Sequence, residues 1–156
     1  MRTNHRWFIA AVVVMGVILG IAACAPATPA PTPTPTQEPA RPTNPGGPGP
    51  ALDLTGDATA GQKVFVDNCV KCHGDEGKGG VANPGSVEDV PALNPIDETM
   101  VNSDAKVFAT NLDLFIEHGS TPDGTPKLTM PAWGDDKMIT AQQIADVIAY
   151  VISLNK

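Results

Sequence analysis

The sequence predicts an all-α domain of few helices that folds around one covalently bound prosthetic group. Apolar residues recur with the period of a helix in three separate stretches, within residues 57–69, 104–118 and 140–154. Two cysteines, Cys69 and Cys72, are separated by two residues and followed directly by His73. Only 4% of the residues are aromatic, too few to line a large ligand cavity with the protein's own rings. A prosthetic group is therefore expected to fill the core.

Composition indicates that the first 23 residues of the 156 are a signal peptide. Arg2 and Arg6 precede seventeen residues without a charged side chain. A membrane-spanning helix needs roughly 20 apolar residues, so cleavage is favoured, with an uncleaved anchor and an ordinary secreted product as the alternatives. The junction before Cys24 is similar to a bacterial lipobox. We therefore expect an exported domain, anchored to the membrane through lipid on Cys24, on its periplasmic or extracytoplasmic face.

A proline-rich segment, residues 24–50, follows the signal peptide. Ten of the 26 residues from Ala25 to Pro50 are proline. Because proline fixes φ and removes N–H donors, we expect a disordered, extended tether that reaches at most about 80 Å, at about 3.1 Å per residue. Residues 51–156 are then the folded domain.

The charge of the exported part limits its partners. The chain has 10 basic and 17 acidic side chains, and loss of Arg2 and Arg6 with the leader leaves a net charge of −9. Such a surface repels nucleic acid and favours partners with basic docking surfaces, mainly by raising the rate of encounter.

The five residues from Cys69 to His73 carry the chemistry. Two thiols at this spacing on a helical turn can add to two vinyl groups of a porphyrin, and the next residue places an imidazole beneath the iron. A thioredoxin-like redox pair is an alternative, but it requires a preceding strand and a long following helix. Zinc is another, but adjacent Cys72 and His73 cannot easily reach one tetrahedral ion. The pattern favours attachment of a c-type haem.

Each predicted helix has a recognisable start. Asp57 can cap the first helix, and Thr140 with Gln143 forms a capping box for the last. The middle helix runs from Asp104 to His118 and is stopped by glycine. A histidine in the last turn interacts favourably with the helix dipole, so His118 is assigned a structural role. The last helix carries an apolar stripe that must be buried: Ile144, Val147, Ile148, Val151 and Ile152.

From about residue 55 to residue 154 the chain resembles the class I cytochrome c family. The resemblance implies a cytochrome c fold with one haem c, attached through Cys69 and Cys72. In that family a glycine and an aromatic residue of the first helix pack against an aromatic residue of the last, and Gly61, Phe65 and Tyr150 occupy these places.

The resemblance also implies the surroundings of the iron. Pro91 looks like the proline whose carbonyl accepts from Nδ1 of the ligand histidine. Residues 129–134 look like the family's methionine loop, which makes Met130 the second axial ligand beside His73; Met100 and Met138 are the alternatives and are more typical of packing residues. Trp133 either covers the haem edge or packs in the core.

The function expected from this resemblance is single-electron transfer by a monohaem carrier, not an enzyme. Its partners would be redox proteins or a membrane oxidase or reductase complex. The alternative is a haem enzyme or gas sensor whose distal face is open to a small molecule. Met130 discriminates between the two, because a sixth protein ligand closes that face.

Overall fold

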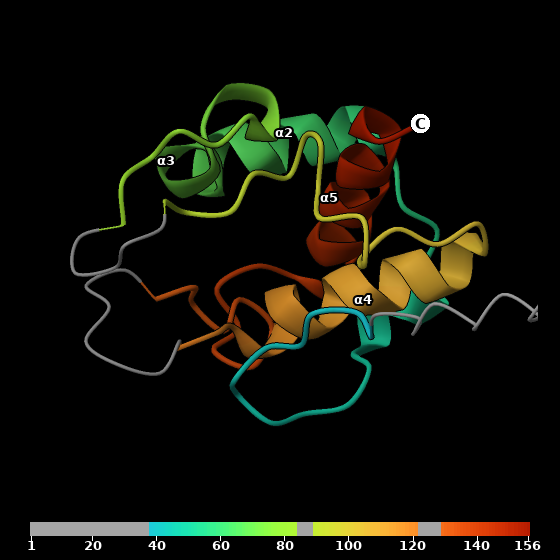
Figure 1. The fold of residues 1–156 in the computed structure, drawn as a ribbon. Helices are drawn as coiled ribbons and strands as arrows, with labels where there is room; N and C mark the ends of the chain where they lie inside the picture. Colours follow the sequence, from blue (N-terminus) through green and yellow to red (C-terminus); the bar gives the residue numbers. More distant parts are fainter. Residues whose placement is uncertain (1–37, 84–88, 122–128) are drawn as a thin grey trace, which may run out of the picture. The chain divides into compact units, whose positions relative to one another are not determined.

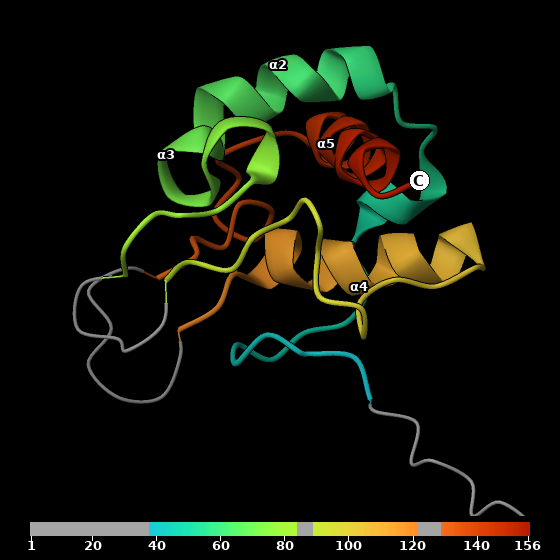
Figure 2. The ribbon, with the colours of Figure 1, turned by 45° about the horizontal axis from the view of Figure 1, so that its top comes forward.

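The computed structural model describes residues 38–83, 89–121 and 129–156, and these form an all-α domain. Its longer helices are α2 (Ala58–Asn68), α4 (Ala105–His118) and α5 (Ala141–Leu154); the shorter elements are η2 (Pro50–Asp53), α3 (Val70–His73) and η3 (Asp75–Gly77). Helix α5 packs against both α2 and α4 (Figures 1 and 2). Each helix in the described ranges is too short or too polar to cross a membrane. The predicted fold class is confirmed.

The three longer helices begin where the sequence predicts. The Asp57 carboxylate accepts from the Thr59 N–H at 2.8 Å at the start of α2. The Asp104 carboxylate accepts from the Lys106 N–H at 2.8 Å at the start of α4. Thr140 and Gln143 form the reciprocal capping box of α5. These side chains satisfy backbone donors that a helix N-terminus leaves without partners.

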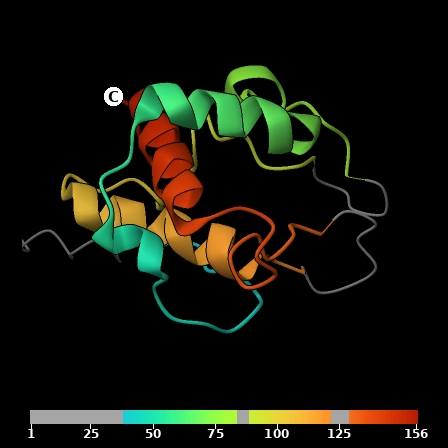
Figure 3. The ribbon, with the colours of Figure 1, turned by 180° about the vertical axis from the view of Figure 1, so that it is seen from behind.

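Helices α2 and α5 cross in close contact (Figure 3). A Cβ atom on Gly61 would lie 1.9 Å from the backbone oxygen of Asp146, so only glycine allows this approach. One turn later the rings of Phe65 and Tyr150 pack with their centroids 5.3 Å apart at an interplanar angle of 59°. The expected packing of the first helix on the last is confirmed, and it fixes the helix that leads to Cys69.

Replacing Phe65 with alanine should destabilise the domain by about 3–5 kcal/mol, the usual cost of truncating a buried aromatic residue. The Phe65 side chain is 1% exposed and contacts Tyr150. The free energy of unfolding in guanidinium chloride measures the effect. Val66→Ala on the same helix is the control, because Val66 is 60% exposed. Equal losses in the two variants would contradict this account of the core.

The helix before the cysteine pair does not run through it. Cys69 ends α2 with φ −109° and ψ −32°, and a separate single turn, α3, carries Cys72 and His73. The N–H groups of Cys72 and His73 donate to the Cys69 carbonyl at 3.1 and 2.9 Å. The two thiols and the imidazole are therefore held on one short turn.

The end of the predicted tether differs from expectation. Residues 43–49, here called the strap, lie along α4 on the side away from α2 (Figures 1 and 3). The Gly49 N–H donates to the Asp113 carboxylate at 2.7 Å. The sequence predicts disorder through Pro50 because the segment cannot form a core, whereas in the structure hydrogen bonds between backbone and side-chain groups join the strap to α4. The signal peptide, Cys24 and residues 25–37 lie outside the described residues.

Candidate functional site

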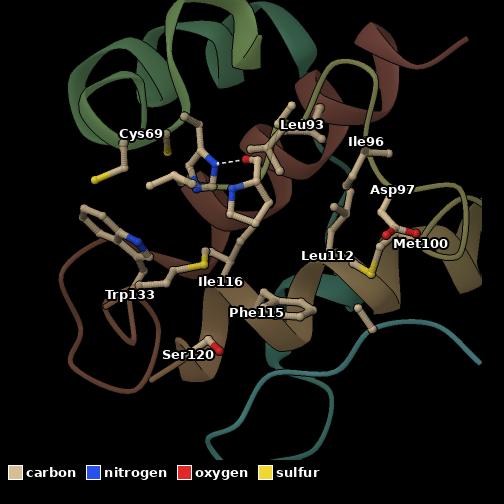
Figure 4. Close-up of a pocket in the computed structure, with 18 of the residues that line it drawn as sticks. Cys69, Leu93, Ile96, Asp97, Met100, Leu112, Phe115, Ile116, Ser120 and Trp133 are labelled. Carbon is tan, nitrogen blue, oxygen red and sulfur yellow. Dashed lines mark hydrogen bonds between the residues drawn. The ribbon is translucent and has the colours of Figure 1, made fainter. Parts of the chain in front are cut away.

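A cavity of about 320 Å³ lies between α3, α4 and the segments 90–97 and 129–133. This volume falls in the usual range of ligand pockets, about 300–1,000 Å³. Its lining is mainly aliphatic and aromatic, and Figure 4 shows the side chains of Leu93, Ile96, Leu112, Phe115 and Ile116 around it. The cavity is suited to a bulky apolar group.

Cys69 and Cys72 both line this cavity as free, half-buried thiols. Burial, together with the neighbouring Cys72, raises the pKa of the Cys69 thiol to about 12. A thiol with such a pKa is uncharged at neutral pH, so its burial carries no cost of desolvating a charge. In Figure 4 Cys69 lies at one end of the cavity and Met100 at the other. The thiols therefore mark the end at which a covalent attachment is possible.

His73 is held by the residue that the family resemblance singles out. Its Nδ1 lies 3.0 Å from the Pro91 carbonyl oxygen, the contact drawn as a dashed line in Figure 4. A carbonyl only accepts, so Nδ1 carries the proton and Nε2 keeps a lone pair. Burial lowers the pKa of His73, an effect that the Pro91 hydrogen bond partly offsets. A neutral imidazole in this tautomer is the form that binds a metal ion.

Met130 lines the cavity, and backbone hydrogen bonds hold its segment in place. Its N–H and carbonyl exchange hydrogen bonds with those of Ser120 at 2.9 and 3.0 Å. Between α4 and Ser120, Gly119 has φ 64°, and a Cβ atom there would lie 2.4 Å from the Met130 oxygen. The sequence shows this glycine as a helix stop; the structure shows that it also admits the methionine loop beside α4.

The other predicted side chains are divided between cavity and surface. Trp133 lines the cavity near the Cys69 end (Figure 4). Met100 is buried in the core and also lines the cavity, at the far end. Met138 is 53% exposed and belongs to the surface. Of the two alternative ligands, the structure brings only Met100 to the cavity.

His118 makes contacts that its sequence position does not reveal. Nδ1 donates to the Asp135 carboxylate at 2.7 Å and Nε2 donates to the Gly47 carbonyl at 2.6 Å. Both partners only accept, so the ring must be the imidazolium. The Asp135 carboxylate and, next, the Gly47 carbonyl raise the pKa of His118. Its role is structural, as expected, but it joins the strap to the methionine loop rather than only ending a helix.

The His118 contacts predict a stability that falls as pH rises. A raised folded-state pKa means that the stabilisation is full below the unfolded value of about 6.5 and is lost through the higher folded value. Asp113, Glu117 and Asp135 surround the ring, and burial raises the pKa of Asp113 and of Glu117. The difference in unfolding free energy between the wild type and His118→Gln should therefore shrink above about pH 6.5. A difference independent of pH would contradict the imidazolium assignment.

Two residues contribute to the site although the sequence does not predict it. Ala40, in the predicted tether, lines the cavity. Asn155, after α5, accepts from the Ile96 N–H at 2.9 Å and donates to the Leu93 carbonyl at 2.8 Å, which fixes the loop after Pro91. The position of Asn155 at a helix C-terminus only weakly indicates such a contact. The proline-rich composition around Ala40 does not indicate that this residue lines a cavity.

The residues around the cavity fit a haem held by thioether bonds. Two thiols share one turn with an imidazole, and that imidazole keeps its Nε2 lone pair. A thioether, Met130, enters from another segment, and the remaining lining is mainly apolar. Soft sulfur and imidazole donors in an apolar cavity suit haem iron. The fold and the site together define a c-type haem protein of the all-α class.

Comparisons with known proteins give the family. The family described as Cytochrome c matches residues 58–155, and the chain belongs to it. The cbb3-type cytochrome c oxidase subunit CcoP of Azospirillum sp. is 36% identical over 109 residues, 66% of this chain and 33% of that protein. Cytochrome c6 of Rippkaea orientalis is 33% identical over 101 residues, 64% of this chain and 73% of that protein. No solved structure is significantly similar.

The match establishes a class I monohaem cytochrome c with covalently bound haem c and a role in electron transfer. The chain spans about a third of the length of the CcoP relatives that it matches. What those larger proteins do as a whole therefore enters only as a proposal for this chain.

Proposed function

We propose that this chain is a single-electron carrier in which Cys69 and Cys72 would hold the haem and His73 and Met130 would ligate its iron. The observation that carries the proposal is the 3.0 Å hydrogen bond from His73 Nδ1 to the Pro91 carbonyl. It fixes the neutral tautomer in which Nε2 is free to bind iron. When bound, the haem supplies a one-electron change between ferrous and ferric iron.

The protein's own residues limit the structural rearrangement that would accompany this change of oxidation state. The Pro91 carbonyl orients His73, and the paired backbone of Ser120 and Met130 holds the thioether. Side chains fixed in this way would keep their positions when the iron changes oxidation state, which would limit rearrangement during electron transfer. Met130 also favours ferrous iron and raises the reduction potential relative to two histidines. With both remaining iron ligands supplied by the chain, the haem would need no substrate pocket.

The proposal includes a membrane tether and a membrane partner. Lipid on Cys24 would hold the mature chain at the outer face of the cytoplasmic membrane, because two or three acyl chains anchor stably. Several relatives are named as subunits of cbb3-type cytochrome c oxidases. We take a membrane oxidase as the partner, one with a basic docking surface to match the acidic domain.

Binding of carbon monoxide distinguishes an electron carrier from the rival class of protein. A haem enzyme or gas sensor leaves one face of the iron open, so its reduced form binds carbon monoxide readily. The carrier proposed here should bind it slowly and weakly, and its ferric form should show the far-red charge-transfer band of sulfur bound to iron. Rapid binding together with an absent band would overturn the carrier assignment in favour of the rival.

The anchor has a separate test. Mass spectrometry of the mature protein from membranes should give a chain that begins at Cys24 and carries diacylglyceryl lipid. Cys24→Ala should remove the lipid and leave the domain unanchored or unprocessed. A mature chain that still begins at Met1 would overturn the lipid anchor and leave the electron-transfer assignment untouched.

A further inference from the structure

The strap, residues 43–49, is bound to α4 by both backbone and side-chain groups. The Asn44 amide donates to the His118 carbonyl at 2.7 Å, and the Gly47 carbonyl accepts from the His118 ring at 2.6 Å. A Cβ atom on Gly46 would lie 2.1 Å from the same ring, so a glycine is required where the strap crosses it. The strap therefore has a defined register on the domain.

At its amino-terminal end the strap binds the segment that holds Met130. The Thr43 hydroxyl donates to the Thr121 carbonyl at 2.6 Å and accepts from the Thr121 N–H at 2.7 Å. Ser120, which precedes Thr121, exchanges two backbone hydrogen bonds with Met130. Residues 120–121 are thus bound by the strap at Thr121 and by the methionine at Ser120.

A second route joins the strap to the far end of the methionine loop. The imidazolium of His118 bridges the Gly47 carbonyl and the Asp135 carboxylate. The backbone N–H groups of Gly134 and Asp135 donate to the Glu117 carbonyl at 3.2 and 3.1 Å, beside His118. The strap is therefore connected to the methionine loop by two routes: through residues 120–121, which pair with Met130, and through Asp135, which directly follows the loop.

We propose that the strap positions Met130 for ligation, so that the end of the tether belongs to the electron-transfer site and is not only a spacer. The proposal rests on the proposed role of Met130 as axial ligand. A thioether is a weak ligand, and its loop must stay in place for the bond to persist. Loss of the Thr43 contacts frees residues 120–121 on one side and lets Met130 leave the iron more often.

Imidazole is the probe, because it binds ferric haem only when it displaces the sixth ligand. In the full-length protein, Thr43→Val removes the bridging hydroxyl and keeps the side-chain shape. We expect its imidazole association constant to rise about two- to tenfold, the range that the net loss of one hydrogen bond allows. The far-red charge-transfer band should weaken in parallel. A role in stability alone would lower the midpoint of unfolding without moving either signal.

Two matched variants control the experiment. Thr43→Ser retains the hydroxyl and should bind imidazole as the wild type does. Thr59→Val makes the same chemical change at an exposed position of α2 and should also leave the affinity unchanged.

The outcomes separate the strap from the ligand itself. Unchanged imidazole affinity and an unchanged band in Thr43→Val overturn the positioning role of the strap and leave Met130 as the ligand. A wild type that lacks the band and binds imidazole as tightly as Met130→Ala overturns the ligand assignment, and the strap proposal with it.

Discussion

Met130→Ala should leave the haem attached and lower the reduction potential by on the order of 100 mV. The thioether favours ferrous iron, and each tenfold of lost preference shifts a one-electron potential by about 59 mV. The variant should also lose the far-red charge-transfer band and bind carbon monoxide rapidly when reduced. Redox titration with absorption spectroscopy measures all three changes.

Met138→Ala is the matched control for this prediction. It removes a methionine side chain eight residues after Met130, at a position that is 53% exposed. Its potential and spectrum should equal those of the wild type. A normal band in Met130→Ala would contradict the ligand assignment, and loss of the band in Met100→Ala would then give the role to the other methionine of the cavity.

His73→Ala should lower the yield of haem-loaded protein by more than about tenfold. Outer-shell partners of a ligand histidine typically alter metal affinity by 10–100-fold, and the ligand itself should matter at least as much. The change also leaves the Pro91 carbonyl without its hydrogen-bond partner on α3. The haem content of the exported protein, from its pyridine haemochrome spectrum, gives the result.

Lys71→Ala is the control within the same turn. Lys71 lies between the two cysteines and is exposed, so its removal should leave both haem content and spectrum unchanged. Any haem that does attach to His73→Ala should show an altered spectrum, because attachment and ligation are separate roles. Full loading with a wild-type spectrum would rule out His73 as the axial ligand.

The parts of this protein that the sequence predicts are those set by local chemistry. Asp57, Thr140 and Gln143 cap helices through residues two or three positions away, so each start can be read without knowledge of the fold. Residues Cys69 to His73 specify their chemistry within one turn. Met130 and Pro91 are found only through the family resemblance, because nothing local marks either as part of the site.

The strap and the His118 bridge could not be predicted, for a physical reason. Gly47 and His118 are 71 residues apart, and the bond uses a backbone carbonyl that every residue type possesses. Periodicity reports on apolar burial, whereas this segment is held by hydrogen bonds of its backbone and short polar side chains.

The covalent attachment is the central claim, and digestion of the denatured protein with trypsin tests it most directly. Trypsin cuts after Lys71, which separates Cys69 from Cys72. If both cysteines form thioether bonds, peptides 64–71 and 72–78 stay together in one species whose mass exceeds their sum by one haem. Two separate peptides, with haem on one or on neither, would contradict the account.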